Sequence, residues 1–391
     1  MITKKILLAS AALVAALAWT TGQLWSEAGA QGDAGLIGVP GSDPLYPPAT
    51  KKIADNALPL GPPLSPAIRS AADLLFADEA AVGETRALII MRDGQQVYER
   101  YADGFTAQTP LISWSMAKSI TAVLIGILVS DGRLSLDMPA PVAAWQRSGD
   151  PRGAITIRDL LQMASGLEHR ESGEPIWKAD TTAMLFGEGV GDMAGFAEAK
   201  PAVATAGELF NYSSATSVIL ADVITGVLTP SRSPAARRDA MLNFVEGRLA
   251  APLAMTSLTP EFDARGTMIG GSIMHATARD YARFGEFLRN RGVVNGQRLL
   301  PEAWMNFMLS PSPVDGGYGG HIWLNRSRPK GSEAALWPER GPNDLFAAIG
   351  HQGQYIIVSP SQRVTVVRLG VTEDPQFPTL RRHLANLVES L

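Results

Sequence analysis

A serine and a lysine three positions apart are the first candidates for catalysis. Ser115-Met-Ala-Lys118 stands at the start of an apolar run of helical length that ends at Ser130-Asp-Gly132. Positions i and i+3 share one face of a helix, so the amine of Lys118 would lie beside the hydroxyl of Ser115. A desolvated lysine with a lowered pKa can take the proton of a serine and make it a nucleophile. The pattern predicts nucleophilic serine catalysis, with a chance match as the alternative. A second copy, Ser327-Arg-Pro-Lys330, has no apolar helix after it and predicts a loop.

Composition limits the other kinds of chemistry. The 391 residues include no cysteine, which excludes disulfides, thiolate catalysis and cysteine-ligated zinc. None of the 5 histidines forms an H-E-x-x-H or another close metal-ligand pair, so we expect no metal and no cofactor. The formal net charge is -4 and there is no basic cluster, so nothing points to a nucleic acid or an anionic membrane surface as a partner.

The N-terminus has the pattern of a secretory signal. Lys4-Lys5 precede a short apolar stretch, Ile6 to Trp19, and Ala28-Gly-Ala30 offers small residues for cleavage. We therefore expect residues 1–30 to be a signal peptide and the protein to be exported, to the periplasm or the extracellular space. An uncleaved membrane anchor is the alternative, although the apolar stretch is short for a spanning helix.

The rest of the chain predicts an arm and one large domain. Residues 31–65 are rich in proline and predict an extended arm, and residues 66–391 predict the folded domain. A hairpin is expected around Asp93-Gly94, and β-prone runs return from Tyr318 onward. Helical patterns fill the middle, at about 130–310. The expected fold class is α/β (α+β), an antiparallel sheet flanked by helices with a helical subdomain inserted.

Further short motifs, here called islands, follow the serine helix along the chain. Tyr212-Ser-Ser214 opens a later helix, and His351-Gln-Gly353 leads into a late strand. Together with Ser115-Met-Ala-Lys118, this order resembles the serine β-lactamase/penicillin-binding superfamily. Within it, the chain is most similar to the class C β-lactamase-like branch, which includes D-alanyl-D-alanine peptidases, family VIII esterases and 6-aminohexanoate-dimer hydrolases. The resemblance covers roughly residues 66–391 and implies a β-lactamase/transpeptidase-like fold.

The resemblance implies a catalytic role for each island. Ser115 would attack a carbonyl carbon and form an acyl-enzyme, Lys118 would take its proton, and Tyr212 would pass a proton to the leaving group. The backbone N–H groups of Ser115 and Gln354 would form the oxyanion hole. Gly353 would leave room for the substrate at the strand edge. Tyr212 titrates near pH ~10 when unperturbed, so it needs a cationic neighbour; the alternative is a capped core tyrosine.

Substrate contacts are expected from residues near these islands. His351 stands where many relatives carry lysine, and it would bind a substrate carboxylate, orient the tyrosine or simply pack. Ser214 stands where relatives that hydrolyse β-lactams or peptides have asparagine. His275 would face the pocket or be a structural histidine near a helix start. Trp177 and His169 would touch the substrate from an irregular, glycine-rich segment.

The departures from the family pattern shape the expected substrate. A serine at position 214 reaches less far than asparagine, and the histidine at position 351 is mostly neutral near pH 7, which both disfavour an efficient β-lactamase. We predict a 6-aminohexanoate-dimer hydrolase-like amidase or an esterase acting on a small-molecule ester or amide. The alternatives are a β-lactamase or D-alanyl-D-alanine carboxypeptidase, and a non-catalytic penicillin-binding-like sensor. The irregular segment 168–200 is expected to set substrate choice.

Overall fold

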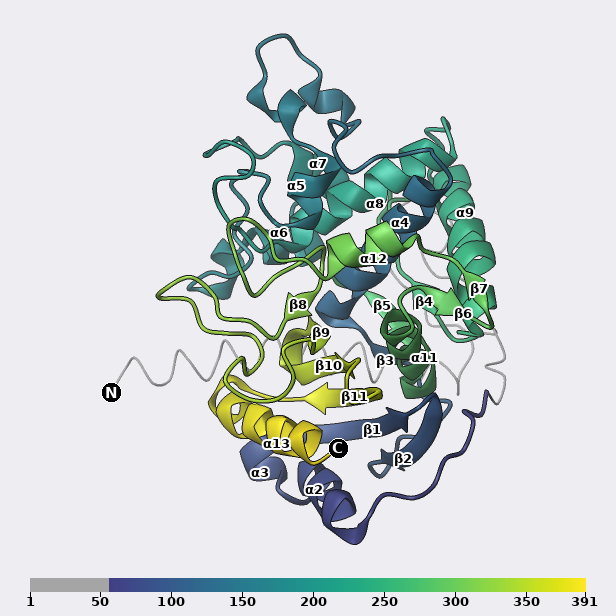
Figure 1. Ribbon diagram of the computed structural model, residues 1–391. Helices are drawn as coiled ribbons and strands as arrows, with labels where there is room; N and C mark the ends of the chain where they lie inside the picture. Colours follow the sequence, from purple (N-terminus) through teal and green to yellow (C-terminus); the bar gives the residue numbers. More distant parts are fainter. Residues whose placement is uncertain (1–55) are drawn as a thin grey trace, which may run out of the picture.

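An antiparallel sheet of 6 strands forms the centre of the computed structural model, which describes residues 56–391. The strands come from both ends of the chain and lie in the order β2-β1-β11-β10-β9-β8 (Figure 1). Every pairing between them is antiparallel, as predicted. The bounds are β1 Glu84–Arg92, β2 Gln95–Tyr101, β8 Trp323–Leu324, β9 Phe346–Gly350, β10 Gln354–Ser359 and β11 Val364–Val371.

The first hairpin turns at Asp93-Gly94, as predicted. Both residues have positive φ, 54° and 79°, which aspartate and glycine tolerate better than branched residues. The end of the proline-rich arm lies along the outer edge of β2, where Gly61 N donates to Gln96 O and Gln96 N donates to Pro59 O. The arm thereby pairs part of an edge strand that would otherwise be open. The signal peptide expected over residues 1–30 lies outside the described residues.

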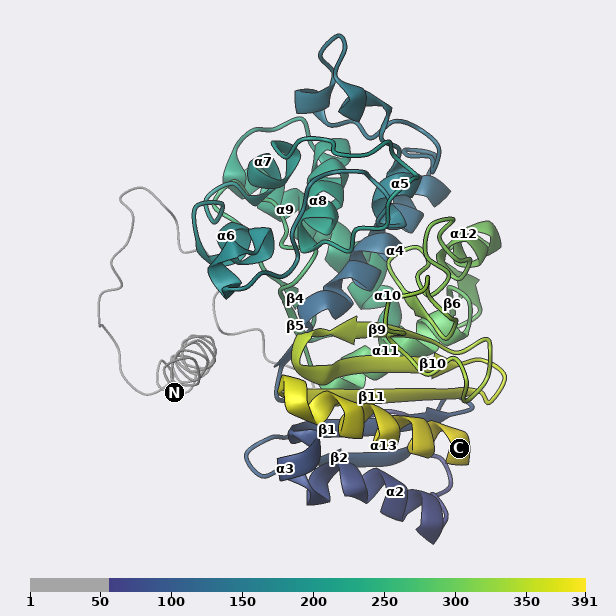
Figure 2. The ribbon, with the colours of Figure 1, turned by 90° about the vertical axis from the view of Figure 1, so that its left-hand side faces the viewer.

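Both faces of the sheet are covered because side chains alternate between them. Leu88 and Ile90 belong to the core under α2 (Pro66–Ala77) and α13 (Phe377–Ser390), whereas Ile89 belongs to the core on the opposite face. α2 and α13 lie side by side on the sheet in Figure 2. A short helix, α3 (Glu79–Val82), connects α2 to β1.

The opposite face carries α11 and a mainly helical part formed by the chain between β2 and β8 (Figure 2). α4 runs through this part with almost every side chain buried, as expected of a helix that is apolar all round. No helix between residues 56 and 391 is both long and apolar enough to cross a membrane. The helices are α4 Ala117–Ser130, α5 Ile157–Leu161, α6 Asp180–Phe186, α7 Met193–Glu198, α8 Ser214–Leu228, α9 Pro234–Val245, α10 Ala251–Leu253, α11 Ala278–Arg289 and α12 Glu302–Met308. Short strands within this part are β3 Leu111–Ile112, β4 Thr259–Pro260, β5 Met274–Ala276, β6 Val293–Val294 and β7 Gln297–Arg298.

Two helix starts show what a local capping pattern does and does not determine. Thr156 and Asp159 form a complete capping box at α5. Thr277 caps α11 in the same way, but the carboxylate of Asp280 instead accepts hydrogen bonds from Ser257 N and Oγ, at 2.8 and 2.5 Å. The Thr156 motif therefore only caps its helix, whereas the Thr277 motif also binds a distant loop to the helix through Asp280.

The segment 168–200 is more regular than expected, because it contains α6 and α7. α7 begins after Asp192, whose side chain accepts a hydrogen bond from Gly195 N at 2.9 Å. The strand expected from Tyr318 onward is shorter than expected, because Gly319 N donates to Ile322 O in a turn before β8.

Candidate active site

Ser115 lies in a 3-10 turn, η1 (Trp114–Met116), directly before α4. The α-helix was expected to include this serine, but it begins later, at Ala117. Trp114 has a φ of 42°, a left-handed conformation that a bulky residue rarely adopts. The turn packs against β9, so it holds a half-buried Ser115 between the sheet and α4.

The buried amine of Lys118 lies at the centre of the site. It donates to Ser115 Oγ at 2.9 Å, to Ser214 Oγ at 2.8 Å and to Gly271 O at 2.8 Å. Burial lowers the pKa of Lys118 to about 8, against the nearby carboxylate of Glu171, which raises it. A fraction of the amine is therefore neutral near pH 7 and able to accept the proton of Ser115.

Glu171 is the site residue that the sequence did not reveal. Its carboxylate accepts hydrogen bonds from Ser214 N, Ser214 Oγ and Thr181 Oγ1, each at 2.6 Å. It also lies 3.9 Å from Lys118 Nζ. Glutamates are common in the segment 168–200, and no spacing marks this one, so the structure alone places it beside Lys118.

The structure corrects the expected role of Ser214. This residue was expected to contact substrate in the place of an asparagine, but it is only 1% exposed. Its hydroxyl accepts a hydrogen bond from Lys118 and donates one to Glu171. A hydroxyl has a single proton to donate, so none is left for a substrate carbonyl.

Tyr212 lies beside the lysine, as the family pattern implies. Its half-buried ring has its centroid 4.8 Å from Lys118 Nζ, and it contacts the rings of Tyr318 and Trp323. Burial raises the pKa of Tyr212, against hydrogen bonding to Ser115, which lowers it. The cationic neighbour is therefore present, but the phenol stays protonated at neutral pH and is suited to donate a proton.

The turn that carries His351 has a different construction from the one expected. Gly353 has a φ of 79°, and a Cβ there would lie 2.7 Å from the guanidinium of Arg368. The reason for glycine is this backbone conformation and the buried arginine, not room for the substrate. Arg368 donates to Gly353 O at 2.9 Å and so braces the turn. His351 itself is exposed, its ring meets that of Trp114 edge-on, and partial desolvation lowers its pKa.

The expected role of Gln354 as the second oxyanion donor stays a prediction. Gln354 opens β10, between β9 and β11, and its side chain is buried against Gly370 O. The serine turn contacts both β9 and β10, and a Cβ on Gly350 at the end of β9 would lie 2.4 Å from Ser113 O. His351, directly after β9, is a second candidate for this donor.

Two of the expected substrate contacts have structural partners instead. His275, in β5, binds Glu261 through Nδ1 at 3.2 Å. His169 is buried, with Nδ1 3.2 Å from Thr216 Oγ1 and Nε2 3.0 Å from Ala197 O. His169 thereby joins α7 and α8, so its expected contact with substrate is corrected to a structural role. For His275, the alternative of a structural histidine is favoured.

Trp177 lies in η4 (Ile176–Lys178) and is 66% exposed. Phe186 and Val190, in the same part of the chain, are also exposed. The indole is outside the packed core, and its expected contact with substrate stays a prediction.

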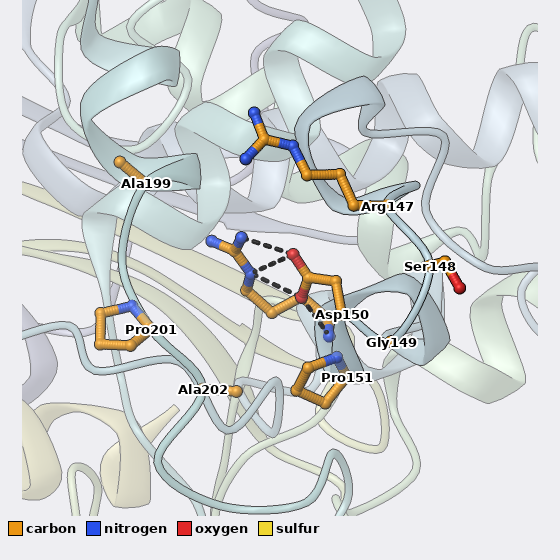
Figure 3. A pocket seen from close by; sticks show the side chains of 9 residues that line it. Arg147, Ser148, Gly149, Asp150, Pro151, Ala199, Pro201 and Ala202 are labelled. Carbon is orange, nitrogen blue, oxygen red and sulfur yellow. Dashed lines mark hydrogen bonds and ion pairs between the residues drawn. The ribbon is translucent and has the colours of Figure 1, made fainter.

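A shallow hollow on the helical part lies apart from the catalytic residues (Figure 3). Its walls come from residues 147–152 and from Ala199, Pro201 and Ala202. Arg152 binds Asp150 at 2.6 Å and also donates to backbone carbonyls of the neighbouring segment. These polar groups are occupied in holding loops together, so the hollow has no catalytic set of its own.

Comparison with known proteins settles the family. A sequence model of the family described as Beta-lactamase matches residues 79–389, which include the serine, lysine, tyrosine and histidine islands. The chain belongs to the β-lactamase family. This β-lactamase-family chain is 24% identical, over 305 residues and 74% of each sequence, to the 6-aminohexanoate-dimer hydrolase of Paenarthrobacter ureafaciens.

Solved structures show the same fold. A Bacillus anthracis protein assigned to the 6-aminohexanoate-dimer hydrolases has a TM-score of 0.62 and 21% identity, with 82% of each chain covered. A family VIII carboxylesterase has a TM-score of 0.57 and 15% identity, with 84% of this chain and 99% of that chain covered. The protein is thus a β-lactamase-family serine hydrolase.

Proposed function

We propose that this hydrolase cleaves an ester or a linear amide of a small molecule through an acyl-enzyme on Ser115. The observation that carries the proposal is the 2.9 Å hydrogen bond between Lys118 Nζ and Ser115 Oγ, beside Tyr212. The similarity to a 6-aminohexanoate-dimer hydrolase and a carboxylesterase supports linear amides and esters as the substrate class.

Acylation begins with proton transfer. Neutral Lys118 takes the proton of Ser115 Oγ as this oxygen attacks the carbonyl carbon, and a tetrahedral intermediate forms. Its negative oxygen is bound by the N–H of Ser115 and by a second backbone N–H, that of Gln354 or of His351. Tyr212 then donates its proton to the leaving nitrogen or oxygen and regains one from the Lys118 ammonium, so the alcohol or amine leaves neutral.

Deacylation uses the same groups in reverse. A water attacks the acyl carbon and loses its proton to the Tyr212–Lys118 pair, and Ser115 Oγ takes a proton as the ester bond breaks. The products are a carboxylic acid and free enzyme, and the protons balance over the two steps.

The surroundings of the serine favour linear substrates over β-lactams. Ser214 faces Lys118 and Glu171, so it supplies no amide to bind the side chain of a β-lactam. The pKa of His351 is lowered by desolvation, so it supplies no fixed positive charge near pH 7 for a substrate carboxylate. A β-lactamase, a carboxypeptidase and a silent sensor are the competing outcomes of the test.

The decisive experiment compares substrates and variants. We expect wild-type protein to hydrolyse p-nitrophenyl butyrate or the linear 6-aminohexanoate dimer with a higher kcat/KM than nitrocefin. Ser115→Ala should reduce kcat/KM for the preferred substrate by about 10³-fold or more. Ser327→Ala, in the second Ser-x-x-Lys, should leave this kcat/KM unchanged. Full activity in Ser115→Ala would refute the proposal. A stable acyl adduct without turnover, seen by intact mass, would favour the sensor.

We also propose that the protein is exported, on the basis of Lys4-Lys5, the apolar stretch and Ala28-Gly-Ala30. Expression in a Gram-negative host should give a mature protein in the periplasm whose mass lacks residues 1–30. Retention of the full-length mass in the membrane fraction would instead indicate an uncleaved anchor.

A further inference from the structure

Glu171 is a carboxylate at the centre of the site that the proposed reaction does not yet use. Its side chain is 26% exposed and lies 3.9 Å from Lys118 Nζ. Ser214 connects the two, because its hydroxyl accepts from Lys118 and donates to Glu171, and its backbone N–H also binds the carboxylate. A hydroxyl from α6, Thr181 Oγ1, fixes the carboxylate from the other side at 2.6 Å.

We propose that Glu171 is a positioning residue that sets the orientation and the proton affinity of Lys118, with Ser214 as the link. The inference rests on the proposed acyl-enzyme function and adds a residue to that same site. Glu171 does not touch the reacting atoms, so its effect passes through the lysine.

The orientation follows from the hydrogen-bond directions. The hydroxyl proton of Ser214 is directed to Glu171, so the oxygen lone pairs are directed to Lys118. The carbonyl of Gly271 fixes the amine from another direction. Both contacts bind the amine through its protons, so the lone pair of neutral Lys118 is directed to its remaining partner, Ser115.

The proton affinity follows from the charges around the amine. The other titratable groups that face Lys118 or Glu171 within the described chain are Tyr212, Tyr318, His169, His321 and His351. Burial raises the pKa of the tyrosines and lowers the pKa of the histidines, that of His321 to about 3. All are therefore neutral near pH 7. Asp180, on the neighbouring helix, is paired with Lys200 at 2.6 Å. Glu171 is thus the negative charge beside Lys118 that stabilises the ammonium formed during acylation.

The test is a pH profile of kcat/KM for a p-nitrophenyl ester from pH 5 to 10. Glu171→Gln removes the charge and keeps the size of the side chain. Its acid limb should move to lower pH by about one unit or more, because the uncompensated ammonium loses its proton more easily. Its plateau value of kcat/KM should fall about 10- to 100-fold, because Lys118 becomes a weaker base and its ammonium is no longer stabilised by a negative charge. The loss is therefore larger at pH 9 than at pH 6.

Matched variants separate charge, position and general damage. Glu168→Gln removes a negative charge from the same segment, where it pairs with Arg170 at the surface at 3.0 Å, and should overlay the wild-type profile. Glu171→Asp keeps the charge and should keep the limb near its wild-type position. Ser214→Ala removes the link but keeps both charges, so the plateau should fall while the limb moves by less than about half a unit.

The proposal is overturned if the pH profile of kcat/KM for Glu171→Gln has the same acid limb and the same plateau as that of the wild-type enzyme. If near-ultraviolet circular dichroism shows that Glu171→Gln is not folded, Ser214→Ala becomes the deciding variant. An unchanged kcat/KM plateau in Ser214→Ala then overturns the proposal. The failure of the proposed function looks different, because Ser115→Ala would then keep full activity. An inactive Ser115→Ala beside an unchanged Glu171→Gln refutes the role of Glu171 alone.

Discussion

In the proposed mechanism, the neutral fraction of Lys118 sets the rate at which Ser115 is acylated. Burial lowers the pKa of this amine from 10.5 to about 8, and the base acts only in its neutral form. We expect kcat/KM for an ester to rise tenfold per pH unit below pH 8 and to level off above it. A stopped-flow profile from pH 5.5 to 10, corrected for spontaneous hydrolysis, checks this. A limb near pH 10 would mean that the amine behaves as an ordinary exposed lysine.

The raised pKa of Tyr212 makes a different prediction, which depends on the leaving group. Nitrophenolate leaves without protonation, whereas the amine of a linear amide must receive a proton. Tyr212→Phe should therefore lower kcat/KM by about 10²- to 10⁴-fold for the linear amide and by much less for the p-nitrophenyl ester. Equal losses on both substrates would assign Tyr212 to binding or to the shape of the pocket. Tyr355→Phe, at a buried tyrosine under α13, serves as the control for losing a buried hydroxyl.

The separate islands were predictable because each has a local pattern, and the structure brings Ser115, Lys118 and Tyr212 together. Glu171 was not predictable, since its partners come from other elements and no spacing in its own segment marks it. The second oxyanion donor was harder to predict for a related reason. A motif shows that a strand is near, but only the fold shows that the serine turn contacts both β9 and β10.

The helix that carries Lys118 depends on one close approach. A Cβ on Gly126 of α4 would lie 2.3 Å from Trp304 Nε1 in α12. Gly126→Ala should lower the free energy of unfolding by about 1–3 kcal/mol, because overpacking outweighs the gain in helix propensity. Urea unfolding followed by tryptophan fluorescence measures the change.

The matched control for this substitution is in α8. Gly226 also lies within a helix, but a Cβ there meets nothing within 4 Å. Gly226→Ala should be neutral or stabilise by up to about 1 kcal/mol. If both variants behaved alike, the contact with Trp304 would have no energetic weight.

Turn and cap motifs in the sequence predicted the elements whose form depends only on neighbouring residues. The Asp93-Gly94 hairpin and the cap at Thr156 formed as expected, because turn and cap residues act on their own neighbours. Contacts between residues far apart in the sequence determined other features of the fold. The carboxylate of Asp280 turned to Ser257, and Gly353 was needed beside Arg368, which no neighbouring residue could indicate.

In the whole molecule, the serine turn lies between two parts of the chain that share a core. Ile89 of the sheet and Ile120 of α4 belong to one continuous cluster, and a second cluster fills the other face of the sheet. The serine turn touches the sheet through β9 and continues into α4. The geometry of the site therefore depends on both parts being folded at once.

The helix α13, on the sheet face away from α4, tests this dependence. Leu384 is fully buried there with Leu88 and Ile357, so Leu384→Ala should lower the free energy of unfolding by about 2–5 kcal/mol. Because the sheet joins both cores, fluorescence, far-ultraviolet circular dichroism and esterase activity should be lost together at one lower urea concentration. Without urea, kcat/KM should stay at the wild-type value, and exposed Arg382→Ala should change neither property. Activity that outlasted the circular dichroism signal would show that the helical part holds the site without the sheet, and that the two parts unfold separately.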